Sequence, residues 1–79
     1  MTEEQIAELV QAELDVYQAN GVELAVIREG VREDSGWWYV PVSRRPQAER
    51  IYQYYEDLTD IEEKLKQKHH LEVLLVPAA

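Results

Sequence analysis

Residues Gly36 to Pro46 read GWWYVPVSRRP, and they hold both tryptophans of the chain. Within this stretch, Trp37 to Val42 is rich in aromatic and β-branched residues, which favour an extended and half-buried strand. Pro41 cannot donate a hydrogen bond to a neighbouring strand. We therefore expect this strand to lie at a sheet edge or to end near Pro41.

A first strand is expected just before this stretch. From Val22 the apolar residues follow a period of two, which predicts a strand running to about Arg32, with Gly30 as a candidate bulge. The sequence Glu33-Asp34-Ser35-Gly36 is typical of a turn between two strands. The two strands should therefore form a hairpin.

The N-terminal residues predict an amphipathic helix. Thr2 and Gln5 have the spacing of a capping box, so the helix should begin at about Glu3. Its apolar stripe has helical spacing and consists of Ile6, Leu9, Val10, Leu14 and Tyr17. Asn20-Gly21 should end it, because both residues tolerate the left-handed conformation of a C-cap.

A second helix is expected from Pro46, which suits the first turn of a helix. Its apolar stripe consists of Ile51, Tyr55, Leu58, Ile61 or Glu62, and Leu65. Thr59 could cap a new helix after a break near Leu58, but the apolar spacing passes through Thr59 without a change of phase. We favour one long helix closed by His69 and His70. Leu71 to Val76 then reads as a short apolar strand.

These elements give the order α-β-β-α-β in a single α+β domain, residues 1–79. A right-handed crossover makes the second and third strands parallel, so the three-stranded sheet is mixed, with two helices packed on one face. The third strand can lie beside the first, giving the spatial order 2-1-3, or beside the second, giving 1-2-3. Pro41 favours 2-1-3, because that order places the second strand at an edge.

Strand alternation sorts the side chains of the sheet onto two faces. The face toward the helices should carry Val22, Leu24, Val26, Trp38, Val40 and Val42. The opposite face should carry Ala25, Ile27, Trp37, Tyr39, Leu74 and Val76. A patch as apolar as this second set usually marks an association surface. We predict an interface formed by Ile27, Trp37, Tyr39, Leu74 and Val76, although a sheet edge is an alternative.

Composition limits the classes of function. The chain has no cysteine, and a core built from 79 residues is thin, so oligomerisation is the remaining common source of stability. Sixteen acidic against eight basic residues argue against binding nucleic acid. No apolar run approaches the roughly 18 residues of a membrane span, and the acidic N-terminus is unlike a signal peptide. We expect a cytoplasmic protein with no membrane partner.

All five arginines lie between Arg28 and Arg50. Arg44 and Arg45 directly precede the expected start of the second helix, and Arg50 follows it. Free backbone N–H groups at a helix start attract anions. This predicts a candidate anion site at Ser43, Arg44, Arg45 and Arg50. No glycine-rich phosphate cradle accompanies these residues, so a polar loop is the competing interpretation.

No catalytic motif is complete. The only serines, Ser35 and Ser43, lie outside any nucleophile motif, and the adjacent His69 and His70 project in different directions and chelate one metal poorly. We expect no enzymatic activity, cofactor or metal. The sequence favours a small acidic association module, most simply a homodimer. An acidic inhibitor or immunity-type protein that blocks a basic partner is the alternative, and a small anion-binding domain is the third possibility.

Overall fold

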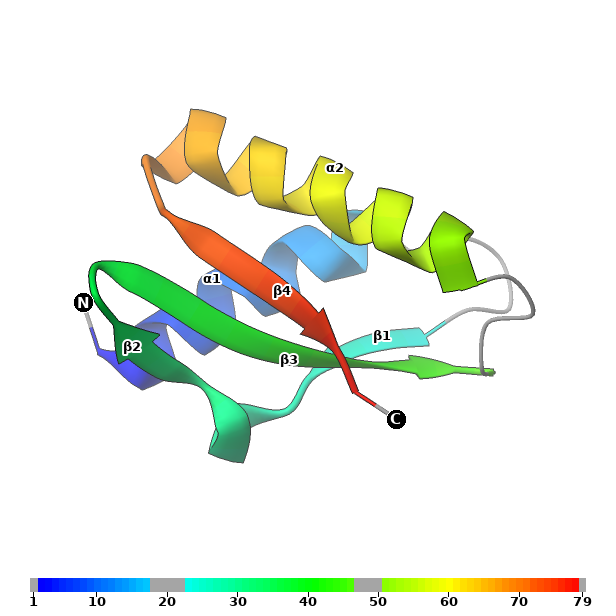
Figure 1. The fold of residues 1–79 in the computed structure, drawn as a ribbon, viewed down its shortest axis with the longest axis horizontal. Helices are drawn as coiled ribbons and strands as arrows, with labels where there is room; N and C mark the ends of the chain where they lie inside the picture. Colours follow the sequence, from blue (N-terminus) through cyan, green and yellow to red (C-terminus); the bar gives the residue numbers. More distant parts are fainter. Residues whose placement is uncertain (1, 18–22, 47–50, 79) are drawn as a thin grey trace.

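The computed structural model of the protein describes residues 2–17, 23–46 and 51–78. These residues form an α+β fold of two helices and a four-stranded sheet (Figure 1). The elements follow one another as α1 (Glu3–Tyr17), β1 (Glu23–Val26), the 3₁₀ turn η1 (Arg28–Gly30), β2 (Arg32–Asp34), β3 (Trp37–Arg45), α2 (Ile51–His69) and β4 (Val73–Pro77).

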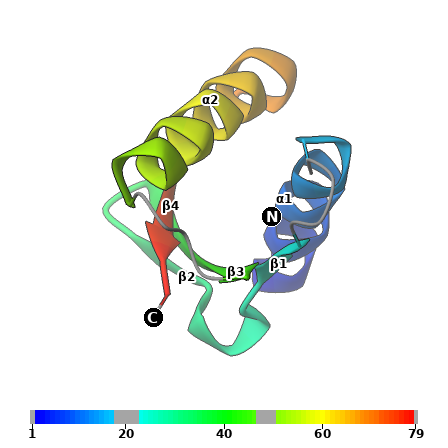
Figure 2. The ribbon, with the colours of Figure 1, turned by 90° about the vertical axis from the view of Figure 1, so that its right-hand side faces the viewer.

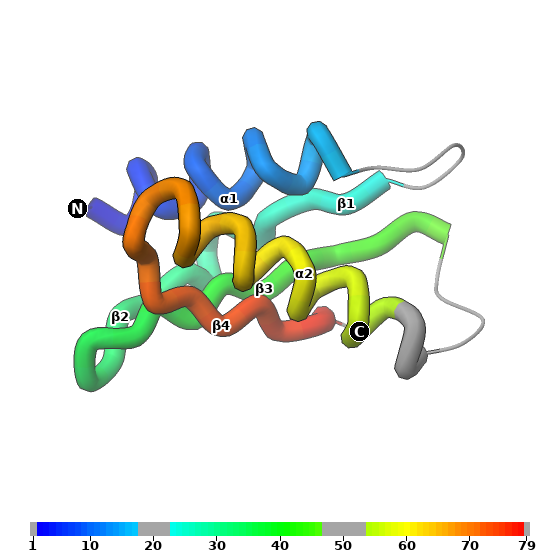
Figure 3. Tube along the Cα trace, turned by 90° about the horizontal axis from the view of Figure 1, so that it is seen from above, coloured from blue at the N-terminus to red at the C-terminus, as the bar shows by residue number. Residues whose placement is uncertain are grey.

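Strand β3 is the centre of the sheet. On one side it pairs antiparallel with β1 and, further along, with β2, and on the other side it pairs parallel with β4. Figure 3 shows β3 lying between β1 and β4. The predicted hairpin and the predicted parallel pair are both confirmed. The preferred spatial order 2-1-3 was wrong, because the second expected strand lies in the middle.

Pro41 therefore lies in the central strand rather than at an edge, and η1 explains how the sheet accommodates it. The C=O of Pro41 accepts a hydrogen bond from the Ile27 N–H at 2.9 Å, so the proline nitrogen faces the same neighbour. Directly after Ile27 that neighbour leaves the ladder as η1. Pro41 has no N–H to donate, but the neighbouring strand is interrupted at this point. No carbonyl group of that strand is therefore left waiting for a hydrogen bond from Pro41.

Gly30 makes this interruption possible. A Cβ atom at Gly30 would lie 2.5 Å from Cγ of Pro41, so only glycine leaves room for the proline ring. The expected first strand is consequently split into β1 and β2, and the bulge predicted at Gly30 takes the form of a 3₁₀ turn. At the end of β2, Ser35 and Gly36 form the two-residue hairpin turn, with φ of 52° and 84°.

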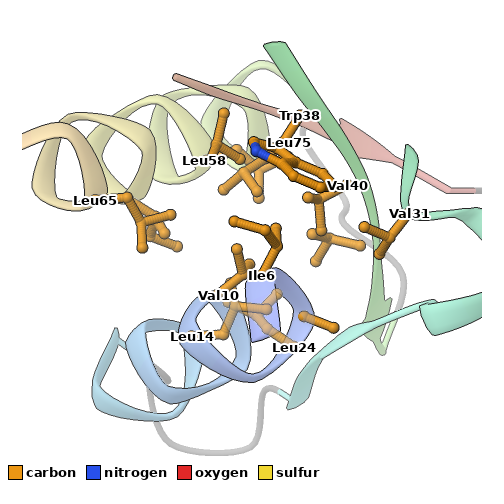
Figure 4. Packing of buried hydrophobic residues seen from close by; sticks show 14 of the residues in the cluster. Ile6, Val10, Leu14, Leu24, Val31, Trp38, Val40, Leu58, Leu65 and Leu75 are labelled. Carbon is orange, nitrogen blue, oxygen red and sulfur yellow. The ribbon is translucent and has the colours of Figure 1, made fainter. Parts of the chain in front are cut away.

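Both helices cover the same face of the sheet, as Figure 2 shows from the end of the molecule. The core between the layers is built from α1, α2 and the inward side chains of the strands (Figure 4). Trp38 belongs to this core, as expected, with 9% of its surface exposed. Val22 and the helix end predicted at Asn20-Gly21 lie outside the described residues.

Sequence signals between neighbouring residues correctly predicted the start of α1 and the continuity of α2. The capping box is present, since the Thr2 N–H donates to Oε1 of Gln5 at 2.9 Å and the Gln5 N–H donates to Oγ1 of Thr2 at 3.1 Å. Helix α2 continues through Thr59 without a break, and the Thr59 hydroxyl donates to the C=O of Tyr55 at 2.9 Å. Both helical predictions are confirmed.

Two expectations at the start of α2 were wrong. Tyr54, not Tyr55, belongs to the core stripe: Tyr54 is 6% exposed and its hydroxyl donates to the C=O of Val42 at 3.0 Å, whereas Tyr55 is 50% exposed. The stripe keeps the helical spacing of four, three and four through Leu58, Ile61 and Leu65. Pro46 lies in a bend after β3, not in a helical turn, because β3 continues to Arg45.

Candidate interaction surface

The face of the sheet opposite the helices carries adjacent rows of apolar side chains. Ile27 is bonded to Pro41, which pairs with Val76, and the next row joins Tyr39 to Leu74. The last row contains Trp37. Of these side chains, Trp37, Leu74 and Val76 are 44%, 41% and 39% exposed. We call Ile27, Trp37, Tyr39, Pro41, Leu74 and Val76 the open face.

The structure thus brings together all five residues of the predicted interface, and it adds Pro41. Sequence reasoning left out Pro41 because it considered this residue only as a sign of a sheet edge or a strand end. Charged side chains border the patch. The guanidinium of Arg32 lies 5.5 Å from the centre of the Tyr39 ring, and Asp34 pairs with Trp37 in the hairpin. An apolar centre with a charged border is the usual anatomy of an association surface.

Charge is divided unevenly between the two layers. The segment from residue 23 to 45 holds four arginines and four acidic residues and is therefore neutral. Helix α1 holds five acidic residues and no basic residue, and α2 holds five acidic residues and three lysines. The negative charge of the protein therefore lies mainly in the helical layer, and the sheet layer carries little electrostatic repulsion.

A glutamine of α1 occupies the free edge of β1. The residues of β1 that face away from β3 are Leu24 and Val26, because Ala25 pairs with Ser43. Nε2 of Gln11 donates to the Leu24 C=O at 3.1 Å, and Oε1 of Gln11 accepts from the Val26 N–H at 2.8 Å. The side-chain amide thus makes the two hydrogen bonds that a neighbouring strand would make.

A glutamate of α2 occupies the free edge of β4. Oε2 of Glu62 accepts a hydrogen bond from the Leu75 N–H at 2.7 Å. Burial raises the pKa of Glu62, and the bond from Leu75 acts in the opposite direction. Sequence reasoning foresaw neither bond: it considered Glu62 only as an alternative to Ile61 in the stripe of α2, and it assigned no contact to Gln11. Only the pairing of the strands shows what they bond.

The described residues of the candidate anion site do not converge. Arg44 and Arg45 are consecutive in β3, so their side chains lie on opposite faces of the sheet. Nη1 of Arg44 donates to the Pro46 C=O at 2.7 Å, and its guanidinium lies 5.9 Å from the centre of the Tyr54 ring. Ser43 donates to the Ala25 C=O at 3.4 Å. Arg50 lies outside the described residues.

Polar contacts join α1 to α2. Nζ of Lys68 donates to Oε1 of the buried Glu13 at 3.1 Å. The hydroxyl of Tyr17 lies 3.1 Å from Oδ1 of Asp57 and 3.3 Å from Oδ2 of Asp60. Burial, together with the bonds and charges of these aspartates, raises the pKa of Tyr17 to about 12. These contacts hold the helical layer together, and sequence reasoning did not foresee them.

The described residues contain neither a cluster of metal ligands nor a membrane-spanning helix. Among them, no three histidine, aspartate or glutamate side chains are placed to hold a metal ion. Neither α1 nor the described α2 is both long and apolar enough to cross a membrane. No protein-family model, no curated protein and no solved structure matches the chain.

Proposed function

We propose that this protein acts by association, as a homodimer that buries the open faces of two sheets against each other. The observation that carries the proposal is the open face itself, because three large apolar side chains lie about two-fifths exposed in one patch. The helices cover the other face of the sheet, and Gln11 and Glu62 bond to the free edges of β1 and β4.

The open face and its charged border together suit a small dimer. In β3 the open face runs from Trp37 to Pro41, about 17 Å, and three adjacent strands span about 14 Å. Two such patches enclose roughly 480 Å² before the relief of the side chains is added, so a stable interface of about 1,000 Å² in total also needs the charged border. The neutral sheet layer also keeps the two acidic helical layers on the outside of the pair.

Substitution of Leu74 by glutamate tests the proposal. A two-fold axis places the same patch on both subunits, so each Leu74→Glu substitution acts twice and should convert the dimer to monomer. The matched control is Val16→Glu on α1, because Val16 is 76% exposed and lies outside the open face. Sedimentation over a concentration series should show a dimer for the wild type and for Val16→Glu, and a monomer for Leu74→Glu.

Two results would contradict this proposal. A wild type that stays monomeric at tens of micromolar would exclude a stable dimer. A Leu74→Glu variant that stays dimeric would move the interface to another surface, such as the helices.

A second candidate function follows from the helical layer. Four of the five acidic residues of α1 are exposed, Glu13 being buried against Lys68, and α1 has no basic residue, a distribution that attracts a basic protein surface. An acidic protein that blocks a basic partner would use this layer rather than the open face. Binding to such a partner should weaken as salt is added, which distinguishes this candidate from the homodimer.

A further inference from the structure

The side of β3 that faces away from the helices changes in bulk from one end of the strand to the other. Its side chains alternate along the strand and are Trp37, Tyr39, Pro41, Ser43 and Arg45. Two large aromatic rings lie at one end. Near the other end the small side chain of Ser43 pairs with the equally small and exposed Ala25. Pro41 is the central residue of the nine in β3, so the face is high on one side of Pro41 and low on the other.

Arg45 ends the low side of this row with an exposed guanidinium. Glu23 is its neighbour in β1, but among the described residues Arg45 forms no ion pair. Arg32 and Arg44 differ from it, because each lies over a tyrosine ring of its own subunit. Arg45 is therefore the arginine of β2 and β3 whose guanidinium is available to a partner.

Two open faces related by a two-fold axis can be seated in two ways. If the axis runs along β3, every side chain of β3 lies over its own copy, so that bulky rings meet bulky rings and Arg45 meets the partner's Arg45. If the axis crosses β3 at Pro41, Trp37 lies over the partner's Arg45 and Tyr39 lies over the partner's Ser43. The second seating places large side chains on small ones and separates the two arginines, as close packing and charge both favour.

We infer that the two subunits pack with their β3 strands in opposite directions, so that Arg45 of each stacks on Trp37 of the other. This inference rests on the proposed homodimer and adds Ser43 and Arg45 to its interface. A guanidinium stacks favourably on a tryptophan ring and can bond to a carboxylate at the same time, here that of Asp34, which pairs with Trp37 in the hairpin. The contact then extends along all nine residues of β3, about 30 Å instead of about 17 Å.

The distance between the two hairpin turns tests the direction of the strands. The chain has no cysteine, so Ser35→Cys gives each subunit a single site for a nitroxide spin label. Ser35 is exposed and lies six residues before Pro41, hence about 20 Å from the inferred axis. Pulsed electron–electron double resonance should therefore give about 40 Å between the labels. Strands in the same direction would place both labels at one end, about 10–20 Å apart.

Two arginine variants test the contact itself. Arg45→Ala should raise the dissociation constant of the dimer roughly tenfold, because each dimer loses two stacked contacts. The matched control is Arg28→Ala, which removes the same charge from η1, where Arg28 is exposed and lies beside Glu3 and Glu4 of α1. The control should leave the dissociation constant within about twofold, since charges away from the interface are screened. Sedimentation over a concentration series measures both constants.

Two results would overturn the inference and leave the homodimer standing. A label distance below about 25 Å in a protein that sediments as a dimer would mean that the strands run in the same direction. An Arg45→Ala dimer no weaker than the Arg28→Ala dimer would mean that Arg45 does not stack on Trp37. A wild type that sediments as a monomer would overturn the homodimer itself, and this inference with it.

Discussion

At the scale of single residues, Trp37 and Trp38 show how strand alternation separates two identical side chains. Trp38 packs in the core, whereas Trp37 is 44% exposed on the open face. Trp38→Ala should therefore destabilise the fold by about 3–5 kcal/mol, the usual cost of removing a large buried aromatic side chain. Trp37→Ala should cost much less in the isolated subunit. Urea unfolding at matched oligomeric state checks this, and equal losses would contradict the assignment of the two faces.

Glu62 makes a hydrogen bond to the edge of β4 that sequence reasoning did not foresee. In Glu62→Ala the Leu75 N–H loses its acceptor at 2.7 Å, and a partly buried donor without an acceptor costs about 1–3 kcal/mol. Glu62→Gln keeps an acceptor oxygen and should be at least as stable as the wild type at neutral pH. Urea unfolding of both variants checks this prediction, and equal losses of stability would mean that the hydrogen bond does not matter.

The same residue predicts a dependence on pH. Burial raises the pKa of Glu62 in the folded state above its ordinary value of 4.5. The stability that Glu62 contributes is therefore fully present below pH 4.5 and is lost as the pH rises through the folded pKa. The advantage of Glu62→Gln should appear in that interval and vanish in more acidic solution. Unfolding curves of the two proteins from pH 3 to pH 8 would show a constant difference if this explanation were wrong.

At the scale of elements, η1 and β3 depend on each other through Gly30 and Pro41. In Gly30→Ala the new Cβ would meet Cγ of the proline ring at 2.5 Å, so we expect a loss of about 1–3 kcal/mol from overpacking. The loss should shrink when Pro41→Ala is also present, because the ring is then gone. A double-mutant cycle measured by urea unfolding gives the coupling between the two sites.

Gly36→Ala is the control for this cycle. A Cβ at Gly36 has no atom within 4 Å, and its cost comes from the positive φ of 84°. Its effect should therefore be independent of Pro41. A coupling at Gly30 no larger than the coupling at Gly36 would contradict the steric explanation.

The elements also show which features a sequence can predict. The capping box of Thr2 and Gln5, the turn at Ser35 and Gly36 and the continuity of α2 depend on neighbouring residues, and all three were predicted. The position of Pro41 was not, because its tolerance depends on η1, which lies on another strand. The roles of Gln11 and Glu62 depend on which backbone groups face outward, and this is decided only when the strands pair.

The residues of the candidate sites show the same difference between local features, which a sequence can predict, and features that depend on strand pairing. Alternation within each strand placed the five predicted interface residues on one face, because the period of two is a local property. Of the anion-site residues that the structure describes, Arg44 and Arg45 lie on opposite faces, because β3 runs three residues further than expected, through Arg45. A groove of about 270 Å³ between α2 and the start of β4 has no signal in the sequence, since its walls come from α2, β3, β4 and the segment before β4.

At the scale of the whole molecule, the net charge of −8 predicts how salt affects association. Two copies repel each other, and added salt screens this repulsion over a Debye length of about 10 Å at 0.1 M. The homodimer should therefore become several-fold tighter between about 20 and 200 mM sodium chloride. Sedimentation at several salt concentrations checks this. A dimer that weakens with salt would show that pairs of opposite charge, not apolar contacts, hold it together.

The hydrogen bonds that Gln11 and Glu62 make to β1 and β4 limit how further strands can add to the sheet. A sheet with a bare edge can recruit one copy after another, each new strand exposing the next edge, so that a filament forms. Here the free edges of β1 and β4 each bond to a helix side chain in the place of a further strand. In the homodimer that we propose, pairing through the open face would consume that face on both partners. The bonds of Gln11 and Glu62 would then oppose further growth through the edges of β1 and β4.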